Sequence, residues 1–326
     1  MPTEARAFWV SEPGRGEHRR ISVSDPGPGQ VLVRTVCTGV SRGTETLVYR
    51  GEVPPGQYQR MRAPFQEGDF PGPVKYGYLN VGVVEEGPDE LRGSVVFCLF
   101  PHQTAYVVPA DAVTPVPNGV PPRRAVLTGT VETAVNALWD AAPLLGDRIT
   151  VVGAGMIGCC VARVASALPG ARVTLVDVDP SRAGIAEALG VGFASPDAAE
   201  PGQDVVIHAS ASAAGLQRSL DLLVPDGEVI ELSWYGDRPV TVGLGGAFHS
   251  SRLGIRASQV GEVALARRGR RTPGERRALA LDLLQDPAFD ALLTGSSPFD
   301  QLPEAMARLA DGRLPALCHV ITYEEG

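Results

Sequence analysis

The stretch Ile149-Thr-Val-Val-Gly-Ala-Gly-Met-Ile-Gly158 decides the fold of this 326-residue chain. A β-branched run leads into three glycines, and a helical pattern over residues 156–168 follows them. Gly153 permits a sharp turn off the strand, Gly155 permits close approach of a ligand to the backbone, and Gly158 permits close packing of the helix on the sheet. This order predicts a Rossmann unit whose helix N-terminus binds a pyrophosphate.

An acidic residue marks the end of the next strand. Asp177 closes the apolar run 172–177 and lies 24 residues after the first glycine, near the spacing of a carboxylate that binds the adenosine ribose. A carboxylate repels a ribose 2′-phosphate, so the sequence favours NAD(H) over NADP(H), while Arg182 keeps NADP(H) open. The predicted cofactor-binding residues of this unit are Gly153, Gly155, Met156, Ile157, Gly158, Asp177 and Arg182.

The composition indicates a globular protein with room for two domains. Charged residues make up 20% of the chain and apolar residues 44%, and no run of 18 apolar residues occurs, so we expect neither disorder nor a membrane partner. The net charge of −8 argues against nucleic-acid binding, although residues 267–277 form a local basic cluster. The N-terminus lacks a signal-peptide pattern and the five cysteines form no C-x-x-C pair, so we expect a cytoplasmic protein with reduced thiols.

The pattern of the sequence changes at about residue 126. Before it, short alternating runs such as 30–36, 81–86 and 105–109 are broken by Gly and Pro, which is typical of an antiparallel β-rich domain. After it, helical and strand patterns alternate and predict a parallel, doubly wound sheet, so the fold class is α/β. The expected segments are a β-rich domain at 1–125, a Rossmann domain at 126–265 and a C-terminal return at 266–326.

Three further segments have sequence patterns that indicate a helix start, an edge strand and a long loop. Thr272 is a candidate helix cap with Pro273 at the first helical position, and residues 253–260 are typical of an edge strand that pairs with a second copy. Residues 57–74 indicate a long loop, either a substrate lid or an ordered surface loop. The predicted helices are 131–145, 156–168, 213–223, 273–284 and 302–309, and the later strands are 149–152, 172–177, 204–208, 228–232, 253–260 and 317–323.

The order of these segments resembles that of the medium-chain dehydrogenase/reductase superfamily, the alcohol dehydrogenase-like enzymes, over nearly the whole chain. Residues 38–45, Thr-Gly-Val-Ser-Arg-Gly-Thr-Glu, are similar to the family's first active-site segment. Residues 75–84 are similar to its second, and residues 297–305 to its late loop. The resemblance implies a GroES-like barrel completed by the C-terminal residues, an active site in the cleft between the domains, and a homodimer.

The chain departs from the family pattern at the catalytic zinc. Zinc-dependent members have cysteine where this chain has Ser41 and His-Glu where it has Tyr78 and Leu79, and their third ligand would fall near residues 129–132. Zinc needs three Cys, His or carboxylate ligands, which these residues do not supply. The lobe with four structural cysteines is missing too, so we expect no zinc and a resemblance to the zinc-free branch. One rival metal set stays open: His102, Glu132 and Cys98.

Without a metal, another group must move the proton that accompanies hydride transfer. Tyr78 is the first candidate because the resemblance puts it where a metal ligand stands, although it can equally be a partly buried space filler. His102 is the second because imidazole titrates near neutral pH, with a turn histidine that caps a carbonyl as the alternative. Glu132 is a catalytic candidate or a carboxylate that stabilises a helix start, and Glu45 a catalytic candidate or a helix cap. Ser41 completes the candidate set.

Other residues are predicted near the cofactor. The resemblance implies that Arg42 meets the pyrophosphate, and an exposed surface arginine is the alternative. Ligands of doubly wound sheets lie beyond the carboxyl ends of the strands, so residues 208–211 and 232–235 should border the nicotinamide half. Ser210 and Ser233 are the candidate contacts in these segments.

The leading hypothesis is a zinc-independent NAD(H)-dependent oxidoreductase that transfers a hydride between nicotinamide and a small or medium alcohol, aldehyde or ketone. The same fold also suits a zinc-free reductase of enones or quinones, for which enone-dependent NAD(P)H consumption is diagnostic. A third hypothesis is a non-catalytic dinucleotide-binding sensor or structural subunit, which would bind NADH without turnover.

Overall fold

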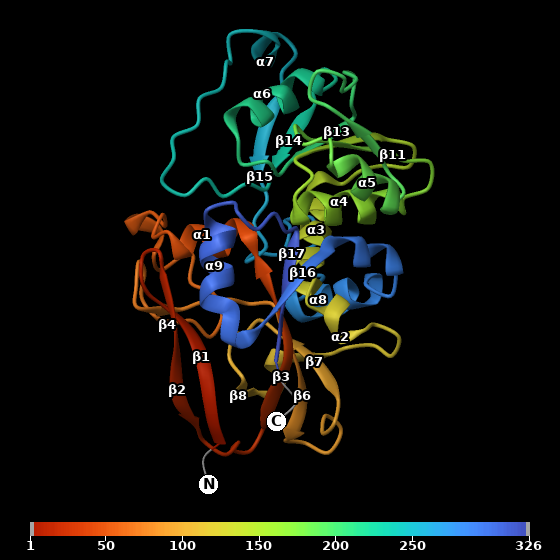
Figure 1. Ribbon diagram of the computed structural model, residues 1–326. Helices are drawn as coiled ribbons and strands as arrows, with labels where there is room; N and C mark the ends of the chain where they lie inside the picture. Colours follow the sequence, from red (N-terminus) through yellow and green to blue (C-terminus); the bar gives the residue numbers. More distant parts are fainter. Residues whose placement is uncertain (1–2, 324–326) are drawn as a thin grey trace. The chain divides into compact units, whose positions relative to one another are not determined.

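The computed structural model describes residues 3–323 and divides into two compact units, each described here by itself (Figure 1). Unit 1 comprises the chain up to Gly129 and from Leu293 onward, and unit 2 is Thr130–Leu292. The second boundary therefore lies later than the expected 265/266. Helix α8 (Pro273–Leu283) belongs to unit 2 because the buried Arg276 guanidinium binds the carboxylate of Glu132 at 3.1 Å and also contacts Asn136.

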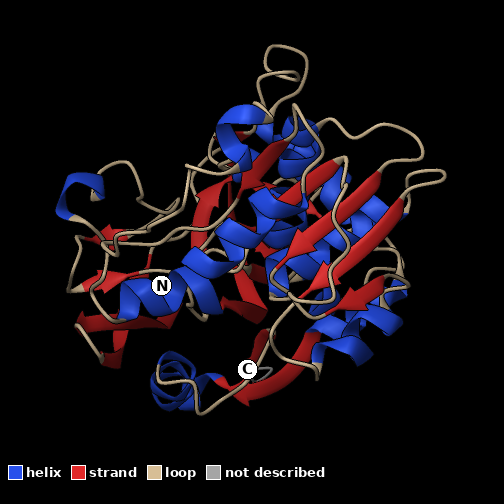
Figure 2. Ribbon diagram, turned by 90° about the horizontal axis from the view of Figure 1, so that it is seen from above, coloured by secondary structure: helices blue, strands red, loops and turns tan. Residues whose placement is uncertain are grey.

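Unit 2 is built on a six-stranded sheet in which all neighbours are parallel, in the order β12-β11-β10-β13-β14-β15. This order, which runs outward in both directions from β10, confirms the doubly wound sheet. Figure 2 shows helices lying against these parallel strands. The strands are β10 (Arg148–Val152), β11 (Arg172–Val176), β12 (Gly192–Ala194), β13 (Val205–His208), β14 (Glu228–Glu231) and β15 (Gly254–Ala257).

The predicted helices of unit 2 are present with small shifts at their ends. Helix α4 begins at Met156 as expected, and α8 begins with a complete capping box in which Thr272 accepts from Glu275 N–H. The central strands β10 and β13 are almost wholly buried, which is why they read as continuous apolar runs. The helices are α3 (Thr128–Ala141), whose first two residues lie in unit 1, α4 (Met156–Ser166), α5 (Arg182–Ala188), α6 (Ala213–Leu222), α7 (Ala247–Ser250) and α8.

Unit 1 is the predicted β-rich domain and contains two sheets. The smaller has the order β2-β1-β5-β4, and the larger β16-β17-β3-β6-β7-β9, with β8 paired to β3. Strand β17 pairs antiparallel with β3, so the C-terminal residues complete this domain as the resemblance implies. The strands are β1 (Thr3–Glu12), β2 (Arg15–Val23), β3 (Gln30–Ser41), β4 (Glu67–Gly68), β5 (Val74–Lys75), β6 (Asn80–Glu86), β7 (Val95–Cys98), β8 (Ala105–Pro109), β9 (Val113–Pro115), β16 (Leu293–Pro298) and β17 (Cys318–Thr322).

The helices of unit 1 are short. Helix α1 follows β3 directly, so the residues at this junction are held between a sheet and a helix. No helix within residues 3–323 has both the length and the apolar character needed to cross a membrane. The helices are α1 (Arg42–Tyr49), α2 (Pro122–Ala125) and α9 (Leu302–Ala310), with short 3-10 turns at Pro55–Gln57, Ala110–Ala112 and Phe299–Gln301 in this unit and at Pro287–Leu292 in unit 2.

Two segments differ from the sequence expectation. The predicted loop 57–74 contains β4 and the start of β5, which pair with each other and tie this segment to the smaller sheet. The predicted edge strand 253–260 is shorter, because Gln259 closes a turn by accepting a hydrogen bond from Gly261 N–H at 2.7 Å. Both differences arise from local hydrogen bonds that a hydrophobic pattern does not encode.

Candidate functional site

The glycine turn after β10 has the backbone geometry that its sequence predicts. Gly153 has φ +110°, and a Cβ there would lie 2.7 Å from the backbone nitrogen of Ser210. A Cβ on Gly158 would lie 1.9 Å from the carbonyl oxygen of Gly153, so only glycine allows helix α4 to approach the turn this closely. A Cβ on Gly155 would meet nothing within 4 Å, so the backbone is open to a ligand there.

The start of helix α4 is suited to an anion. Gly155 is its N-cap and has no side chain with which to satisfy the first N–H groups. Met156 and Ile157 supply these first amides, and the partial positive charge of the helix end is added to them. The residues therefore fit the pyrophosphate of a dinucleotide, which is the assignment that the sequence made.

Asp177 lies beside this turn and is hydrogen-bonded to it. Its Oδ2 accepts from Ala154 N–H at 2.7 Å and its Oδ1 accepts from Asp179 N–H at 2.9 Å. Each carboxylate oxygen keeps a further lone pair for a ribose hydroxyl. Arg182 Nε lies 3.2 Å from Asp179 Oδ2, so the arginine that kept NADP(H) open is engaged by a carboxylate of the protein itself.

Unit 1 brings together four of the residues that the sequence singled out. The side chains of Ser41 and Thr44 lie near the phenol of Tyr78 and lower its pKa. Ser41 N–H donates to Glu45 Oε1 at 2.8 Å, and Glu45 Oε2 lies 2.8 Å from His102 Nε2. We call Tyr78, Ser41, Thr44, Glu45 and His102 the phenol cluster. It lies at the junction of β3 and α1, which holds Ser41, Thr44 and Glu45 within one turn of chain.

His102 is deeply buried, and its ring binds side chains rather than the backbone carbonyl that the alternative interpretation of the sequence expected. Its side chain is 1% exposed, and both ring nitrogens are engaged, Nε2 by Glu45 and Nδ1 by Thr38 Oγ1 at 2.6 Å. Because a carboxylate only accepts, Nε2 carries the proton and Nδ1 accepts from the Thr38 hydroxyl when the ring is neutral. His102 can therefore act only through Glu45 or Thr38.

The surroundings of Tyr78 define what its phenol can do. Burial, and then the carboxylate of Glu45, raise the pKa of Tyr78 to about 12, and hydrogen bonds from Ser41 and Thr44 oppose this rise only in part. The phenol is therefore protonated at neutral pH and is a hydrogen-bond donor rather than a base. A neutral phenol and the Ser41 hydroxyl are poor zinc ligands, so these residues do not fit the metal site of zinc-dependent relatives.

The structure corrects the assignment of Glu132. Its carboxylate is buried in an ion pair with Arg276, and Arg277 lies 4.0 Å away. Burial raises the pKa of Glu132, while the two arginines oppose the rise. Glu132 is thus a structural partner of helix α8 rather than a catalytic group.

The rival metal set is not assembled. His102 is paired with Glu45, and Glu132 is paired with Arg276. Within residues 3–323 no three His, Cys, Asp or Glu side chains are grouped as metal ligands.

The remaining predicted cofactor residues differ in their surroundings. Arg42 is exposed at the first position of α1. Ser233 uses its hydroxyl to accept from Ala211 N–H at 3.0 Å, and Ser210 Oγ lies 2.6 Å from His208 Nε2. The sequence placed Ser210 and Ser233 at the ends of their strands. It gave no chemical role to His208, which contacts both serines in the structure.

No protein-family model matches the chain. It is similar to a 2-desacetyl-2-hydroxyethyl bacteriochlorophyllide A dehydrogenase of Cereibacter sphaeroides, with 26% identity over 324 residues that cover 91% of this chain and 94% of the relative. Among solved structures it is similar to an alcohol dehydrogenase of Escherichia coli CFT073 complexed with NADH (16% identity, TM-score 0.77, 98% of this chain and 99% of the other). It is also similar to a zinc-binding dehydrogenase of Sinorhizobium meliloti 1021 bound to NADP (17% identity, TM-score 0.78, 98% and 99% of the two chains). The chain therefore has the fold of the medium-chain dehydrogenase/reductase superfamily of alcohol dehydrogenase-like oxidoreductases, and its sequence is similar to that of a dehydrogenase over nearly its whole length.

Proposed function

We propose that the chain is a zinc-independent, NAD(H)-dependent oxidoreductase that acts on a small or medium alcohol, aldehyde or ketone. The observation that carries the proposal is the phenol cluster, which surrounds a hydroxyl donor, Tyr78, that the family resemblance puts at the position of a metal ligand. The curated relative supports an alcohol substrate, since its name refers to a hydroxyethyl group. NAD(H) is preferred because Asp177 repels a 2′-phosphate and Arg182 is paired with Asp179.

The nicotinamide supplies the hydride chemistry when it is bound. Tyr78 donates a hydrogen bond to the substrate oxygen and stabilises the negative charge that develops on it. Ser41 and Thr44 orient the phenol, and Glu45 accepts from Ser41 N–H and from His102, which keeps the carboxylate in place. In the direction of reduction, the proton of the phenol passes to the oxygen of the product, directly or through water.

The test combines binding, metal analysis and a substrate screen. We expect NADH to bind more tightly than NADPH by intrinsic fluorescence titration, the purified protein to contain less than stoichiometric zinc, and at least one alcohol or carbonyl compound to react. Tyr78→Phe should lower kcat/KM by about 100-fold while leaving the Kd for NADH within about twofold, because it removes one donor to a developing charge. Tyr76→Phe is the matched control, since it removes a neighbouring buried phenol outside the phenol cluster.

Three results would contradict this proposal. Stoichiometric, tightly held zinc would return the chain to the zinc-dependent branch. Turnover of enones but not of alcohols or simple ketones would instead assign a double-bond reductase, which needs the same donor but a different substrate. NADH binding without turnover across the whole panel would indicate a sensor or structural subunit.

A further inference from the structure

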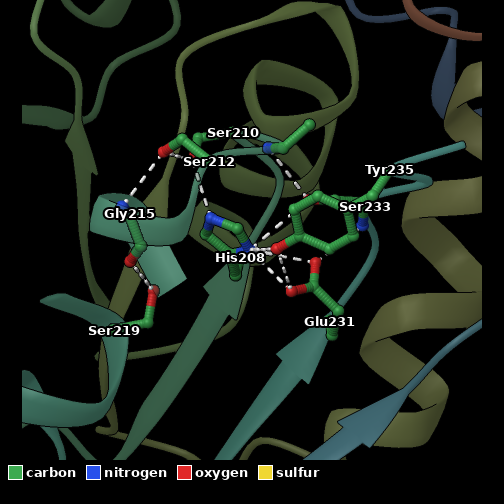
Figure 3. Close-up of polar contacts among 9 residues, drawn as sticks. His208, Ser210, Ser212, Gly215, Ser219, Glu231, Ser233 and Tyr235 are labelled. Carbon is green, nitrogen blue, oxygen red and sulfur yellow. Dashed lines mark hydrogen bonds and ion pairs between the residues drawn. The ribbon is translucent and has the colours of Figure 1, made fainter. Parts of the chain in front are cut away.

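A second polar cluster lies at the carboxyl ends of β13 and β14 in unit 2 (Figure 3). His208 Nδ1 lies 2.9 and 2.8 Å from the two carboxylate oxygens of Glu231, and His208 Nε2 lies 2.6 Å from Ser210 Oγ. Tyr235 O–H donates to Glu231 at 2.9 Å, and Ser233 N–H donates to it at 2.7 Å. The imidazole is thus held between a carboxylate and a serine hydroxyl.

The charges in this cluster are defined by burial and hydrogen bonds. Burial alone would raise the pKa of Glu231, but hydrogen bonds from His208 and Ser233 outweigh it and leave the pKa below its usual value, so the group is a carboxylate at neutral pH. Burial, and then this carboxylate, raise the pKa of Tyr235, which therefore remains a phenol and donates. The imidazole of His208 is 0% exposed and has no route to solvent except through its partners.

These protonation states give the hydrogen bonds one direction. A carboxylate only accepts, so Nδ1 carries a proton, and when the ring is neutral Nε2 is an acceptor. The hydroxyl of Ser210 donates to Nε2 and cannot donate elsewhere. Ser212 Oγ accepts from Gly215 N–H at 3.0 Å, and its own proton is directed to Ser210 Oγ at 2.9 Å. Ser210 is left with one lone pair, so it can receive a hydrogen bond but cannot give one.

The backbone around Ser210 is adapted to this arrangement. A Cβ on Gly215 would lie 2.2 Å from Ser210 Oγ and 2.9 Å from His208 Nε2, so glycine is needed there to make room for their contact. Ala211 has φ +52°, a conformation that costs a non-glycine residue free energy. On its other side, the backbone of Ser210 packs against Gly153 of the dinucleotide turn.

The order of the strands indicates which part of a dinucleotide lies near Ser210. The turn after β10 takes the pyrophosphate, and Asp177, at the end of β11, takes the adenosine ribose on one side of it. Ser210 follows β13, the neighbour of β10 on the opposite side. The group beyond the pyrophosphate on that side is the ribose of the nicotinamide half.

We propose that Ser210 accepts a hydrogen bond from a hydroxyl of the nicotinamide ribose, and that His208 and Glu231 are positioning residues that keep Ser210 in its acceptor state. This inference rests on the proposed use of a nicotinamide dinucleotide and adds the side chains that recognise its second ribose. Ser210 is the binding residue, and the buried pair behind it acts only through the serine hydroxyl.

The experiment measures Kd values for NADH, ADP-ribose and AMP, of which only the first two contain the second ribose. Ser210→Ala should raise the Kd for NADH and the Kd for ADP-ribose by about fivefold each, which is the effect of losing one hydrogen bond. The Kd for AMP should not change. Ser219→Ala is the matched control, because Ser219 lies in the neighbouring helix α6 and its buried hydroxyl donates to Gly215 C=O. It should leave the affinity for all three ligands unchanged.

Two variants of His208 test the positioning role. His208→Gln keeps an acceptor near the place of Nε2 and should bind NADH within about twofold of the wild type, whereas His208→Asn loses that acceptor and should match Ser210→Ala. Adding Ser210→Ala to His208→Asn should cause no further loss, because both changes remove the same interaction. Melting temperatures identify any variant whose lower affinity comes from unfolding.

The outcomes separate this inference from the proposed function. If the wild type binds NADH and Ser210→Ala binds it with the same Kd, the inference alone would be overturned. An equal rise in the Kd for AMP in Ser210→Ala would overturn it too. Equal losses in His208→Gln and His208→Asn, both folded, would overturn the positioning role. A wild type that binds no NADH at millimolar concentration would remove the proposed function, and this inference with it.

Discussion

At the scale of single residues, the roles of the polar groups depend on partners that are distant in sequence. Tyr78 became a candidate through the family resemblance and His102 through the chemistry of imidazole, but the sequence could not show that the Glu45 carboxylate binds His102 and also raises the pKa of Tyr78. The sequence left Glu132 as a catalytic candidate or a carboxylate that stabilises a helix start, but Glu132 lies beyond the first turn of α3 and pairs with the buried Arg276, 144 residues away. His208 was missed because a histidine at a strand end has no signal until Glu231 and Ser210 are seen beside it.

One ion pair gives a prediction for pH dependence. Hydrogen bonds from the Arg148 side chain and backbone lower the pKa of Asp204 to about 2 from an ordinary value of 3.8. A carboxyl whose pKa is depressed on folding stabilises the protein above its unfolded pKa, and the stabilisation is lost as the pH falls through the folded pKa. Asp204→Asn should therefore lower the free energy of unfolding by about 1 kcal/mol at pH 7, a value reduced for the partial exposure of the pair.

The measurement is urea unfolding of wild type and variant at pH 7, 5 and 3. The difference between them should be the same at pH 7 and 5 and smaller at pH 3. Asp221→Asn is the control, since Asp221 accepts from the amide of Gln217 and not from an arginine. A difference for Asp204→Asn that does not change between pH 7 and 3 would contradict the prediction.

At the scale of elements, periodicity and capping signals were sufficient where the element is regular. The glycine turn, α4 and the start of α8 were predicted at their first residues because Gly, Pro and a capping threonine act locally. The long hairpin of β1 and β2 was not assigned, since its pairing is seen only in the register between the two strands. The short β4 and β5 were taken for loop, because two-residue strands have no pattern of their own.

The close contact between helix α4 and the glycine turn gives a second prediction. Gly158→Ala would put a Cβ against the carbonyl oxygen of Gly153, a backbone atom that can move only if the turn moves. We expect a loss of about 2 kcal/mol in the free energy of unfolding and at least a tenfold weaker Kd for NADH, measured by urea unfolding and fluorescence titration. Gly184→Ala in α5 is the matched control, because its Cβ meets nothing within 4 Å.

Gly184→Ala should change the free energy of unfolding in the opposite direction from Gly158→Ala. Alanine at position 184 should raise the free energy of unfolding by up to about 1 kcal/mol, since alanine is the better helix former, and leave the Kd unchanged. If Gly158→Ala bound NADH as the wild type does, the turn would not be the phosphate site that we assign.

At the scale of the whole molecule, the two-domain plan was predictable and its second boundary was not. The change from alternating to helical patterns near residue 126 matches the observed division at Gly129. The later boundary lies at Leu292, because Arg276 ties α8 to α3 of unit 2 through Glu132 and Asn136. Sequence reasoning treated α8 as part of the C-terminal return, since a pair of residues so far apart leaves no periodic signal.

Assembly gives the last prediction, and we propose that the chain forms a homodimer through β15. This strand is the last of the six in unit 2, so one of its edges has no neighbouring strand within residues 3–323, and Ile255 on it is 39% exposed. An exposed edge can pair with its copy across a two-fold axis. Ile255→Lys should give a monomer in sedimentation velocity at micromolar concentration, while Ile255→Val should remain a dimer, because a lysine on the edge opposes pairing and valine preserves the apolar contact. A monomeric wild type, or a lysine variant that sediments as the wild-type dimer does, would exclude this interface.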